Sequence, residues 1–230
     1  MPFDASKFTV PTAKPLPIVL LLDTSGSMSG SKIDNLNQAV REMLDNFAQE
    51  EKMETEILVS IITFGEQVKL HVPFTKASEV NWIDLDANGM TPMGMALQMA
   101  KAMIEDKNVT TGRAYRPTVV LVSDGQPNDS WEQPLDDFIH NGRSSKCDRM
   151  ALAIGADADR SVLTRFVDGT GNPLFEANQA SKIHEFFERV TMSVTMRTKS
   201  KNPNESIPLS NTNPSPIPST TTTDNDDDIW

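Results

Sequence analysis

The amino-acid sequence predicts an α/β fold: a doubly wound, mostly parallel sheet with one antiparallel edge strand and helices on both faces. Two unbroken apolar runs, Ile18 to Leu22 and Val119 to Val122, are typical of strands that are buried on both faces. Segments whose apolar residues recur at helical spacing lie between the predicted strands. Strands that alternate with helices in this way indicate a parallel sheet covered by helices on both sides.

In the first half of the chain, we expect a helix, a second strand and an edge strand after the strand at 18–22. The strand at 18–22 is followed by a helix whose start has the capping-box spacing of Ser31 and Asp34. The apolar face of this helix is made of Ile33, Leu36, Val40, Met43, Leu44 and Phe47. A second strand is expected at 56–64, and the alternating run at 68–72 predicts a half-exposed antiparallel edge strand.

A methionine-rich helix is expected next. Thr91 and Pro92 suit the N-cap and the first helical position. We expect this helix to be well buried, with its methionines in the core except for Met90 and Met93 near the loop. Its apolar positions are Met93, Met95, Leu97, Met99, Ala100, Met103 and Ile104.

The second half predicts a further strand, helix and strand series. The strand at 117–122 precedes a short helix around 134–140 and a strand at 150–154. A helix through Val162, Leu163 and Phe166, a short strand at 174–176 and a closing helix follow. The closing helix is marked by Ile183, Phe186, Phe187, Val190 and Val194.

Three regions follow from these patterns: an N-terminal extension at 1–14, one domain at 15–198 and a tail at 199–230. The tail is rich in Pro, Ser, Thr and Asn and ends in an acidic run. It holds too few apolar side chains to offset the entropy of ordering, so we expect it to be disordered. Phosphorylation of threonines 220–223, docking through the acidic run or Trp230, and a merely solubilising extension all stay open.

Charge and cysteine content narrow the partners and the compartment. The formal charge of −11 disfavours nucleic acid, because phosphates would be repelled. A single cysteine, Cys147, excludes a disulfide framework and favours a reducing compartment. The run at 18–22 is too short for a signal peptide or a membrane span. These features predict a cytoplasmic protein with no nucleic-acid or membrane partner.

Oxygen-bearing side chains follow the ends of the two apolar strands. Asp23, Ser25 and Ser27 follow the first strand, Asp124 follows the second, and Thr91 precedes the methionine-rich helix. Hard oxygen donors suit Mg²⁺, with Mn²⁺ or Ca²⁺ as alternatives, and short crowded side chains favour the smaller ions. Taken singly, each residue is also explained as a turn or capping residue, but their joint placement at strand ends predicts a metal site.

These five positions, in this order, resemble the metal-ion-dependent adhesion site (MIDAS) of von Willebrand factor A (VWA) domains. The resemblance covers about Pro17 to Thr198 and implies a Rossmann-like fold in which bound metal captures an Asp or Glu of a protein partner. One departure is that Met90 stands where the family often has a second glycine before the threonine.

Within the family the chain looks similar to bacterial tellurium-resistance proteins of the TerY type. The matching segments are 21–28, 62–64, 91–94, 123–127 and 155–159. This narrower resemblance implies a stress-response role, with a Ser/Thr kinase and a phosphatase as possible associates.

An interaction module is therefore expected rather than an enzyme. The alternatives are a VWA adaptor subunit of an ATP-driven remodelling or chelatase-type complex, and a Mg²⁺-dependent phosphoryl-transfer enzyme. The sequence has no phosphate-binding Gly-x-x-x-x-Gly-Lys loop, and its three histidines, His71, His140 and His184, are scattered.

Overall fold

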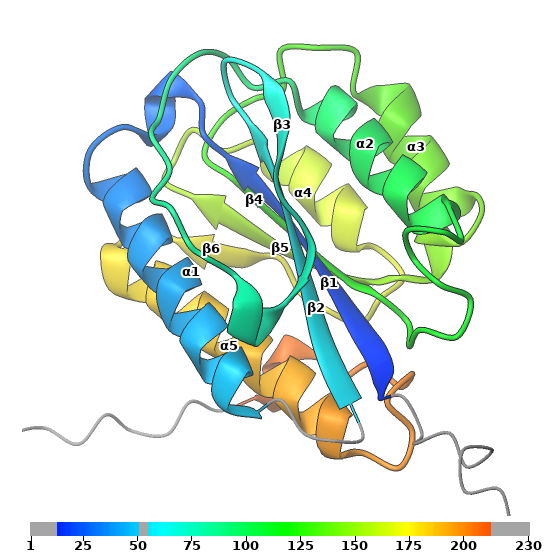
Figure 1. The fold of residues 1–230 in the computed structure, drawn as a ribbon. Helices are drawn as coiled ribbons and strands as arrows, with labels where there is room; N and C mark the ends of the chain where they lie inside the picture. The colour runs from blue at the N-terminus through cyan, green and yellow to red at the C-terminus, as the bar shows by residue number, and fades with distance from the viewer. Residues whose placement is uncertain (1–12, 51–54, 213–230) are drawn as a thin grey trace, which may run out of the picture.

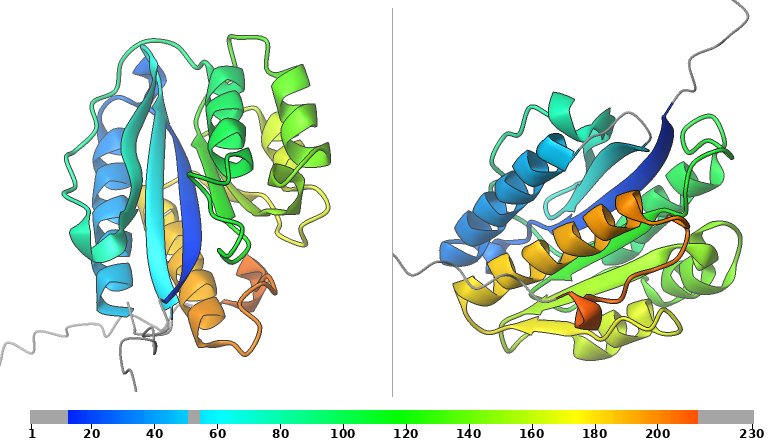
Figure 2. Two further views of the ribbon diagram at one scale, coloured as in Figure 1. Left: turned by 45° about the vertical axis from the view of Figure 1, so that its right-hand side comes forward. Right: turned by 90° about the horizontal axis from the view of Figure 1, so that it is seen from below.

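The computed structural model describes residues 13–50 and 55–212 and shows a six-stranded sheet between two layers of helices (Figures 1 and 2). The strands are β1 Lys14–Asp23, β2 Thr55–Phe64, β3 Val68–Lys76, β4 Thr118–Ser123, β5 Asp148–Ile154 and β6 Phe175–Ala177. The helices are α1 Ser31–Glu50, α2 Met93–Glu105, α3 Glu132–His140, α4 Arg160–Val167 and α5 Ala180–Lys199. Helices α1 and α5 cover one face, and α2, α3 and α4 cover the other. The predicted fold class is confirmed.

The order of the strands, β3-β2-β1-β4-β5-β6, places β1 and β4 side by side in the middle of the sheet. Strand β1 is parallel to β2 on one side and to β4 on the other. Strand β3 pairs antiparallel with β2 at the edge, as its alternating sequence predicts. The chain therefore winds outward in both directions from β1 and β4, and it leaves a topological switch point between them.

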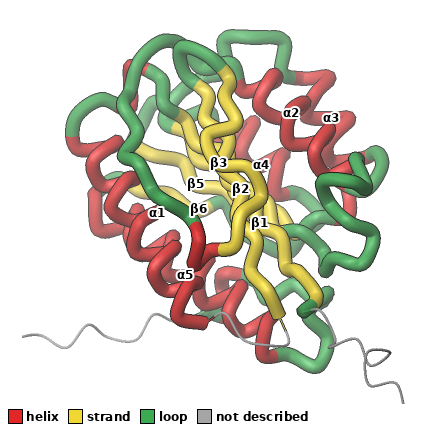
Figure 3. The backbone as a smooth tube through the Cα atoms, in the orientation of Figure 1, coloured by secondary structure: helices red, strands yellow, loops and turns green. Residues whose placement is uncertain are grey.

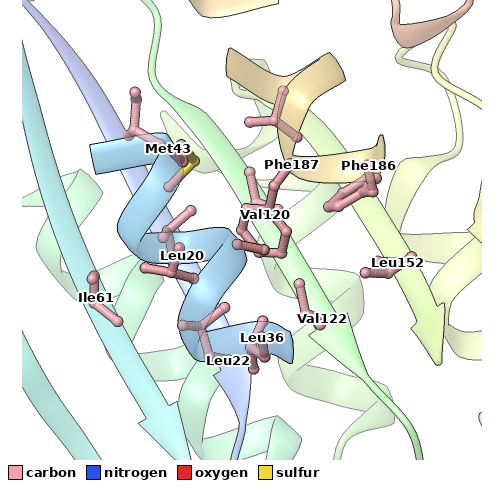
Figure 4. Packing of buried hydrophobic residues seen from close by; sticks show 14 of the residues in the cluster. Leu20, Leu22, Leu36, Met43, Ile61, Val120, Val122, Leu152, Phe186 and Phe187 are labelled. Atoms are coloured by element: carbon pink, nitrogen blue, oxygen red, sulfur yellow. The ribbon is translucent and has the colours of Figure 1, made fainter. Parts of the chain in front are cut away.

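The unbroken apolar run of β1 is explained by burial on both faces. Leu20 and Leu22 pack in the cluster beneath α1 and α5, whereas Val19 and Leu21 pack in the cluster beneath the other three helices. Figure 4 shows the first cluster, with Leu20 and Leu22 of β1 beside Val120 and Val122 of β4, under Met43 of α1 and Phe187 of α5. Alternate side chains thus anchor the central strand to both helical layers.

Two helix starts differ from the sequence prediction. Helix α2 begins at Met93, so Pro92 occupies the N-cap and Thr91 lies outside the helix. The Asp129 carboxylate instead accepts from Gly94 N and from Met95 N, at 3.0 and 2.9 Å. At the start of α1, Asp34 N donates to Gly30 O at 3.2 Å, so backbone closes that turn where the side chain of Ser31 was expected to.

The methionine prediction for α2 is partly wrong. Met93 is fully buried although it was expected to lie outside the core, and Met95, expected inside, is 56% exposed. Helix α2 buries the stripe of Met93, Leu97, Ala100 and Ile104, which leaves Met95 on the outer side.

Within the described part of the chain, no helix is both long and apolar enough to span a bilayer.

Residues 200–212 also differ from the predicted disordered tail, because they pack against the domain. Leu209 is buried, and its amide donates to Asn172 Oδ1 at 3.0 Å. Ser193 of α5 donates to Ile207 O at 2.6 Å, and Arg189 donates to Leu209 O at 3.1 Å. The remainder of the tail, 213–230, and residues 1–12 of the N-terminal extension lie outside the described residues.

Candidate metal centre

The two carboxylates predicted as ligands meet at the switch point of the sheet. Asp23 is the last residue of β1, and Asp124 directly follows β4. The parallel register pairs Leu22 with Val122, so both strands end at the same level. Loops gather around this end of the sheet (Figure 3). Ligands of doubly wound folds bind in the crevice beyond the carboxyl ends of such strands.

A continuous set of hydrogen bonds links four of the predicted ligands. Ser25 N donates to Asp23 Oδ1 at 2.8 Å, and Ser25 Oγ lies 2.9 Å from Ser27 Oγ. Ser27 Oγ in turn donates to Asp124 Oδ1 at 2.7 Å. The other oxygen of Asp23, Oδ2, accepts from Ser123 Oγ at 2.5 Å. Ser123 was not predicted from the sequence, although it immediately precedes Asp124.

Thr91 completes the set from a different segment. A Cβ atom built on Gly125 would lie 3.5 Å from Thr91 Oγ1 and 3.7 Å from Ser27 Oγ, so both hydroxyls border the same backbone. Thr91 is buried, and its amide donates to Asn128 Oδ1 at 2.9 Å. The loop that carries Asp124 therefore also fixes the position of Thr91, through a residue that sequence reasoning missed.

Asn128 and Asp129 act together on the start of α2. Asn128 holds Thr91, and Asp129 caps the first two free amides of the helix. Asn and Asp in a loop do indicate hydrogen bonding to nearby backbone. Their partners at the start of α2 lie more than thirty residues away in sequence, so no local pattern reveals which helix they cap.

Backbone hydrogen bonds hold the loop after β1 to two neighbouring segments of the chain. Thr24 N donates to Phe64 O at 2.8 Å, and Gly26 N donates to Gly89 O at 3.0 Å. Gly89 has φ of +83°, and a Cβ there would lie 2.4 Å from Glu66 Cα. A glycine is therefore required at position 89 by both dihedral angle and space.

The site holds two buried carboxylates, whose charge a divalent cation would neutralise. Burial raises the pKa of Asp23 from 3.8 to about 6, and the negative charge of Asp124 adds to this, against hydrogen bonds from Ser123 and Ser25. Asp124 is fully buried, and its Oδ2 lies 2.5 Å from the ammonium of Lys32. Lys32 also donates to Ser27 O at 3.2 Å. This lysine was not predicted as part of the site.

The donor chemistry fits a hard divalent cation. The predicted site consists of two carboxylates and three hydroxyls. Among residues 13–50 and 55–212, no three or more His, Cys, Asp or Glu side chains are grouped so that they could hold a metal ion. Oxygen-only donor sets suit Mg²⁺, Mn²⁺ or Ca²⁺ better than softer ions. Five protein oxygens leave an octahedral shell incomplete, so water or an outside ligand would complete it.

Three other reactive side chains have partners outside the five predicted ligands. His71 stacks edge-on against Trp82, with ring centroids 5.7 Å apart, and burial lowers its pKa. His184 pairs with Glu42 of α1. Cys147 lies just before β5, where burial raises the pKa of its thiol to about 12 and keeps it protonated.

Comparison with known proteins gives a consistent family. The profile of the von Willebrand factor type A domain matches residues 18–189. Human inter-alpha-trypsin inhibitor heavy chain H4 is 22% identical in an alignment of 194 positions that covers 78% of this chain. The chain spans about a fifth of that relative's length, the aligned share being 20%.

Solved structures share the fold. A von Willebrand factor type A protein from Catenulispora acidiphila superposes with a TM-score of 0.61 and 19% identity, over 80% of this chain and 43% of that one. Proximal thread matrix protein 1 from the mussel byssus, with a zinc-occupied MIDAS motif, superposes with a TM-score of 0.61 and 16% identity, over 80% and 46%.

Proposed function

Because the chain belongs to the von Willebrand factor type A domain family, we propose that it is a metal-dependent protein-interaction module. In this proposal the five residues that hold the cation are Asp23, Ser25, Ser27, Thr91 and Asp124. The observation that carries it is the series of hydrogen bonds that links Asp23, Ser25, Ser27 and Asp124 at the switch point. Such a set is a prearranged cation site at the place where this topology binds ligands.

The bound cation supplies attraction for a carboxylate. The chain carries a formal charge of −11, so an acidic partner would be repelled at long range. A divalent cation reverses the sign locally and has an incomplete protein shell. An Asp or Glu side chain of a partner protein completes that shell. We assign Mg²⁺ as the ion, with Mn²⁺ or Ca²⁺ as substitutes, on the basis of the oxygen donors.

A binding role is supported over catalysis by the surroundings of the site. The described histidines have other partners: Trp82 for His71, Asp136 for His140 and Glu42 for His184. Ser25 Oγ contacts Ser27 Oγ, and Ser27 Oγ donates to Asp124, a carboxylate that pairs with Lys32 and that this proposal assigns to the cation. Nucleophilic catalysis needs an activating base beside the nucleophile. We therefore assign no reaction to the site.

The narrower assignment rests on the resemblance to TerY-type proteins. It is that the chain acts in the bacterial cytoplasm, in a tellurium-resistance-like stress response, with a Ser/Thr kinase and a phosphatase among its associates. The alternative, an adaptor role in an ATP-driven complex, predicts different neighbouring genes. A gene neighbourhood that encodes such a kinase and phosphatase supports the first role, and one that encodes an ATPase of the remodelling class overturns it.

The metal-binding proposal is tested with the double variant Ser25→Ala/Ser27→Ala. It removes two hydroxyl donors and leaves both carboxylates, whereas Ser29→Ala, at an exposed position in the same loop, is the matched control. Calorimetric titration with Mn²⁺ should show one site in the wild-type and control proteins and at least tenfold weaker binding in the double variant. Equal affinities in all three would overturn the site assignment.

The interaction proposal is tested separately, by pull-down in Mg²⁺ and in EDTA. Partners should be retained only with Mg²⁺ and only by proteins with the intact site. If the same partners bind in EDTA, the interaction surface lies elsewhere and the metal does not bridge it.

A further inference from the structure

Lys32 lies directly beside the proposed metal ligands without being one of them. Its ammonium contacts Asp124 Oδ2 at 2.5 Å and Ser27 O at 3.2 Å. The Lys32 side chain is 32% exposed, whereas Asp124 is fully buried beneath it. An ammonium carries three donors, so these two contacts leave one N–H for a further acceptor.

On one side, Lys32 borders a hollow of the surface that none of the five proposed ligands lines. A hollow of about 180 Å³ lies between the start of α1, the end of β5 and the start of α5. Lys32 lines it together with Asn35, Asn178, Gln179 and the backbone of Gly155. A Cβ on Gly155 would lie 3.7 Å from Lys32 Nζ, so the absence of a side chain there keeps the ammonium accessible.

Taking the proposed function as given, we infer that Lys32 is a specificity-determining residue that recognises the partner's carboxylate together with the metal ion. One carboxylate oxygen completes the metal shell, and the other accepts a hydrogen bond from Lys32 Nζ. Two adjacent cationic groups match the two oxygens of an Asp or Glu, and they discriminate against neutral oxygen ligands such as amides and alcohols.

The same position makes Lys32 and the cation antagonists when no carboxylate is present. Both are positive, and both use Asp124, so each weakens the hold of the other. An incoming carboxylate neutralises both and removes this conflict. Metal and carboxylate should therefore bind with positive coupling, each raising the affinity for the other.

Two effects of opposite sign follow for Lys32→Gln. Loss of the competing charge should tighten Mn²⁺ binding by about twofold to fivefold, the size expected for a partly exposed ion pair. Loss of the ammonium donor should weaken acetate binding to the Mn²⁺-loaded protein by about threefold to tenfold, as for a partly solvated charged hydrogen bond. A residue with a merely structural role would not move the two affinities in opposite directions.

The experiment uses Mn²⁺ and acetate as probes on the full chain. The electron paramagnetic resonance signal of free Mn²⁺ reports metal binding, and the relaxation of the acetate methyl protons by bound Mn²⁺ reports the carboxylate. Lys32→Arg, which keeps a charged donor, should retain acetate binding. Lys199→Gln is the matched control, because Lys199 pairs with Glu50 through a surface ion pair at the far end of α5.

The outcomes separate this inference from the proposed function. Wild-type protein that takes up no Mn²⁺, or that binds Mn²⁺ but not acetate, overturns the proposed function. Wild-type protein that binds both, with Lys32→Gln unchanged in acetate affinity, overturns only the role of Lys32. Opposite shifts in Lys32→Gln, with Lys32→Arg and Lys199→Gln close to wild type, support it.

Discussion

The buried carboxylate of Asp23 lies at the end of β1, in the centre of the predicted site. It accepts hydrogen bonds from Ser25 N and Ser123 Oγ, but burial still raises its pKa to about 6. Holding the charged form at neutral pH therefore costs free energy in the metal-free protein. A bound cation would offset that cost, so we expect Asp23 to favour metal binding and to destabilise the protein when no metal is bound.

Replacing Asp23 by Asn should separate these two effects. The amide oxygen can accept from Ser25 N while the amide group donates to Ser123 Oγ, so the fold is kept. We expect the metal-free variant at neutral pH to be more stable than wild type by about 1–3 kcal/mol, which follows from a pKa shift of about two units. Mg²⁺ should no longer stabilise it. Urea denaturation in EDTA and in Mg²⁺ measures both effects.

A variant that is destabilised in EDTA would contradict this account of Asp23. Asp45→Asn, at an exposed position on α1, is the matched control for the loss of one carboxylate charge. It should change neither the stability in EDTA nor the response to Mg²⁺ by more than about 0.5 kcal/mol.

The pH dependence of stability gives a second prediction at the residue scale. The pKa of Asp23 is raised from 3.8 to about 6, so the folded protein keeps a proton that the unfolded chain releases. Its contribution to stability is therefore full below pH 3.8 and is lost as the pH rises through about 6. The difference in unfolding free energy between wild type and Asp23→Asn should grow over this window in EDTA. A difference that is independent of pH would show that Asp23 is not the titrating group.

The sequence predicts which residues meet at the site where those residues lie at the ends of strands. Asp23 and Asp124 follow apolar runs, and parallel strands finish at a common edge, so their proximity follows from the sequence. Lys32 was not predictable, because a long side chain at the start of a helix reaches Asp124 only through three-dimensional placement. Helical position alone says which face a residue lies on, and not what its tip contacts.

At the scale of elements, the start of α2 is controlled by the loop after β4. Asn128 bonds to the amide of Thr91, and Asp129 caps Gly94 N and Met95 N. The sequence suggested that Thr91 itself would cap the helix. Because the loop supplies the cap, the hydroxyl of Thr91 is free to face Ser27 over Gly125. The same loop thus explains why Thr91 does not cap α2 and why its hydroxyl borders the predicted site.

Removing Asn128 should therefore weaken metal binding although it is not a ligand. We expect Asn128→Ala to lower Mn²⁺ affinity by about threefold to tenfold. The backbone amide of Thr91 would lose its hydrogen bond to the Asn128 side chain, which is worth roughly 1 kcal/mol. Calorimetric titration with Mn²⁺ measures this. Asn108→Ala, at an exposed position beyond the end of α2, is the matched control. An unchanged affinity for Asn128→Ala would show that Thr91 needs no such support or is not a ligand.

At the scale of the whole molecule, the segment that follows α5 closes the end of the sheet opposite to the metal site. Arg197 of α5 is fully buried, and its guanidinium donates to Pro203 O, to Thr118 Oγ1 and to Arg116 O at 2.9, 2.6 and 2.6 Å. It also lies 4.0 Å from the buried carboxylate of Asp148. One side chain thus joins α5, the start of β4, the start of β5 and the segment 200–212.

This closure could not be read from the sequence, although the sheet could. Residues 200–212 resemble a disordered tail in composition, and their main apolar anchor, Leu209, is a single residue without periodic neighbours. Their order depends on long-range hydrogen bonds to backbone carbonyls, which leave no local pattern. An arginine in the last turn of a helix usually indicates a solvated end, and here it is buried instead.

Replacing Arg197 should therefore unfold the closure and destabilise the entire domain. Arg197→Ala removes three hydrogen bonds and leaves the Asp148 carboxylate buried without its cation, so we expect a loss of about 3–5 kcal/mol in unfolding free energy. Arg197→Lys keeps the charge but not the planar fork that reaches three acceptors, so it should recover only part of this loss. Lys199→Ala, two residues on in the same helix, removes a surface ion pair and should cost less than about 1 kcal/mol. Urea denaturation in Mg²⁺ measures all three; a small effect of Arg197→Ala would mean that the domain folds without this closure.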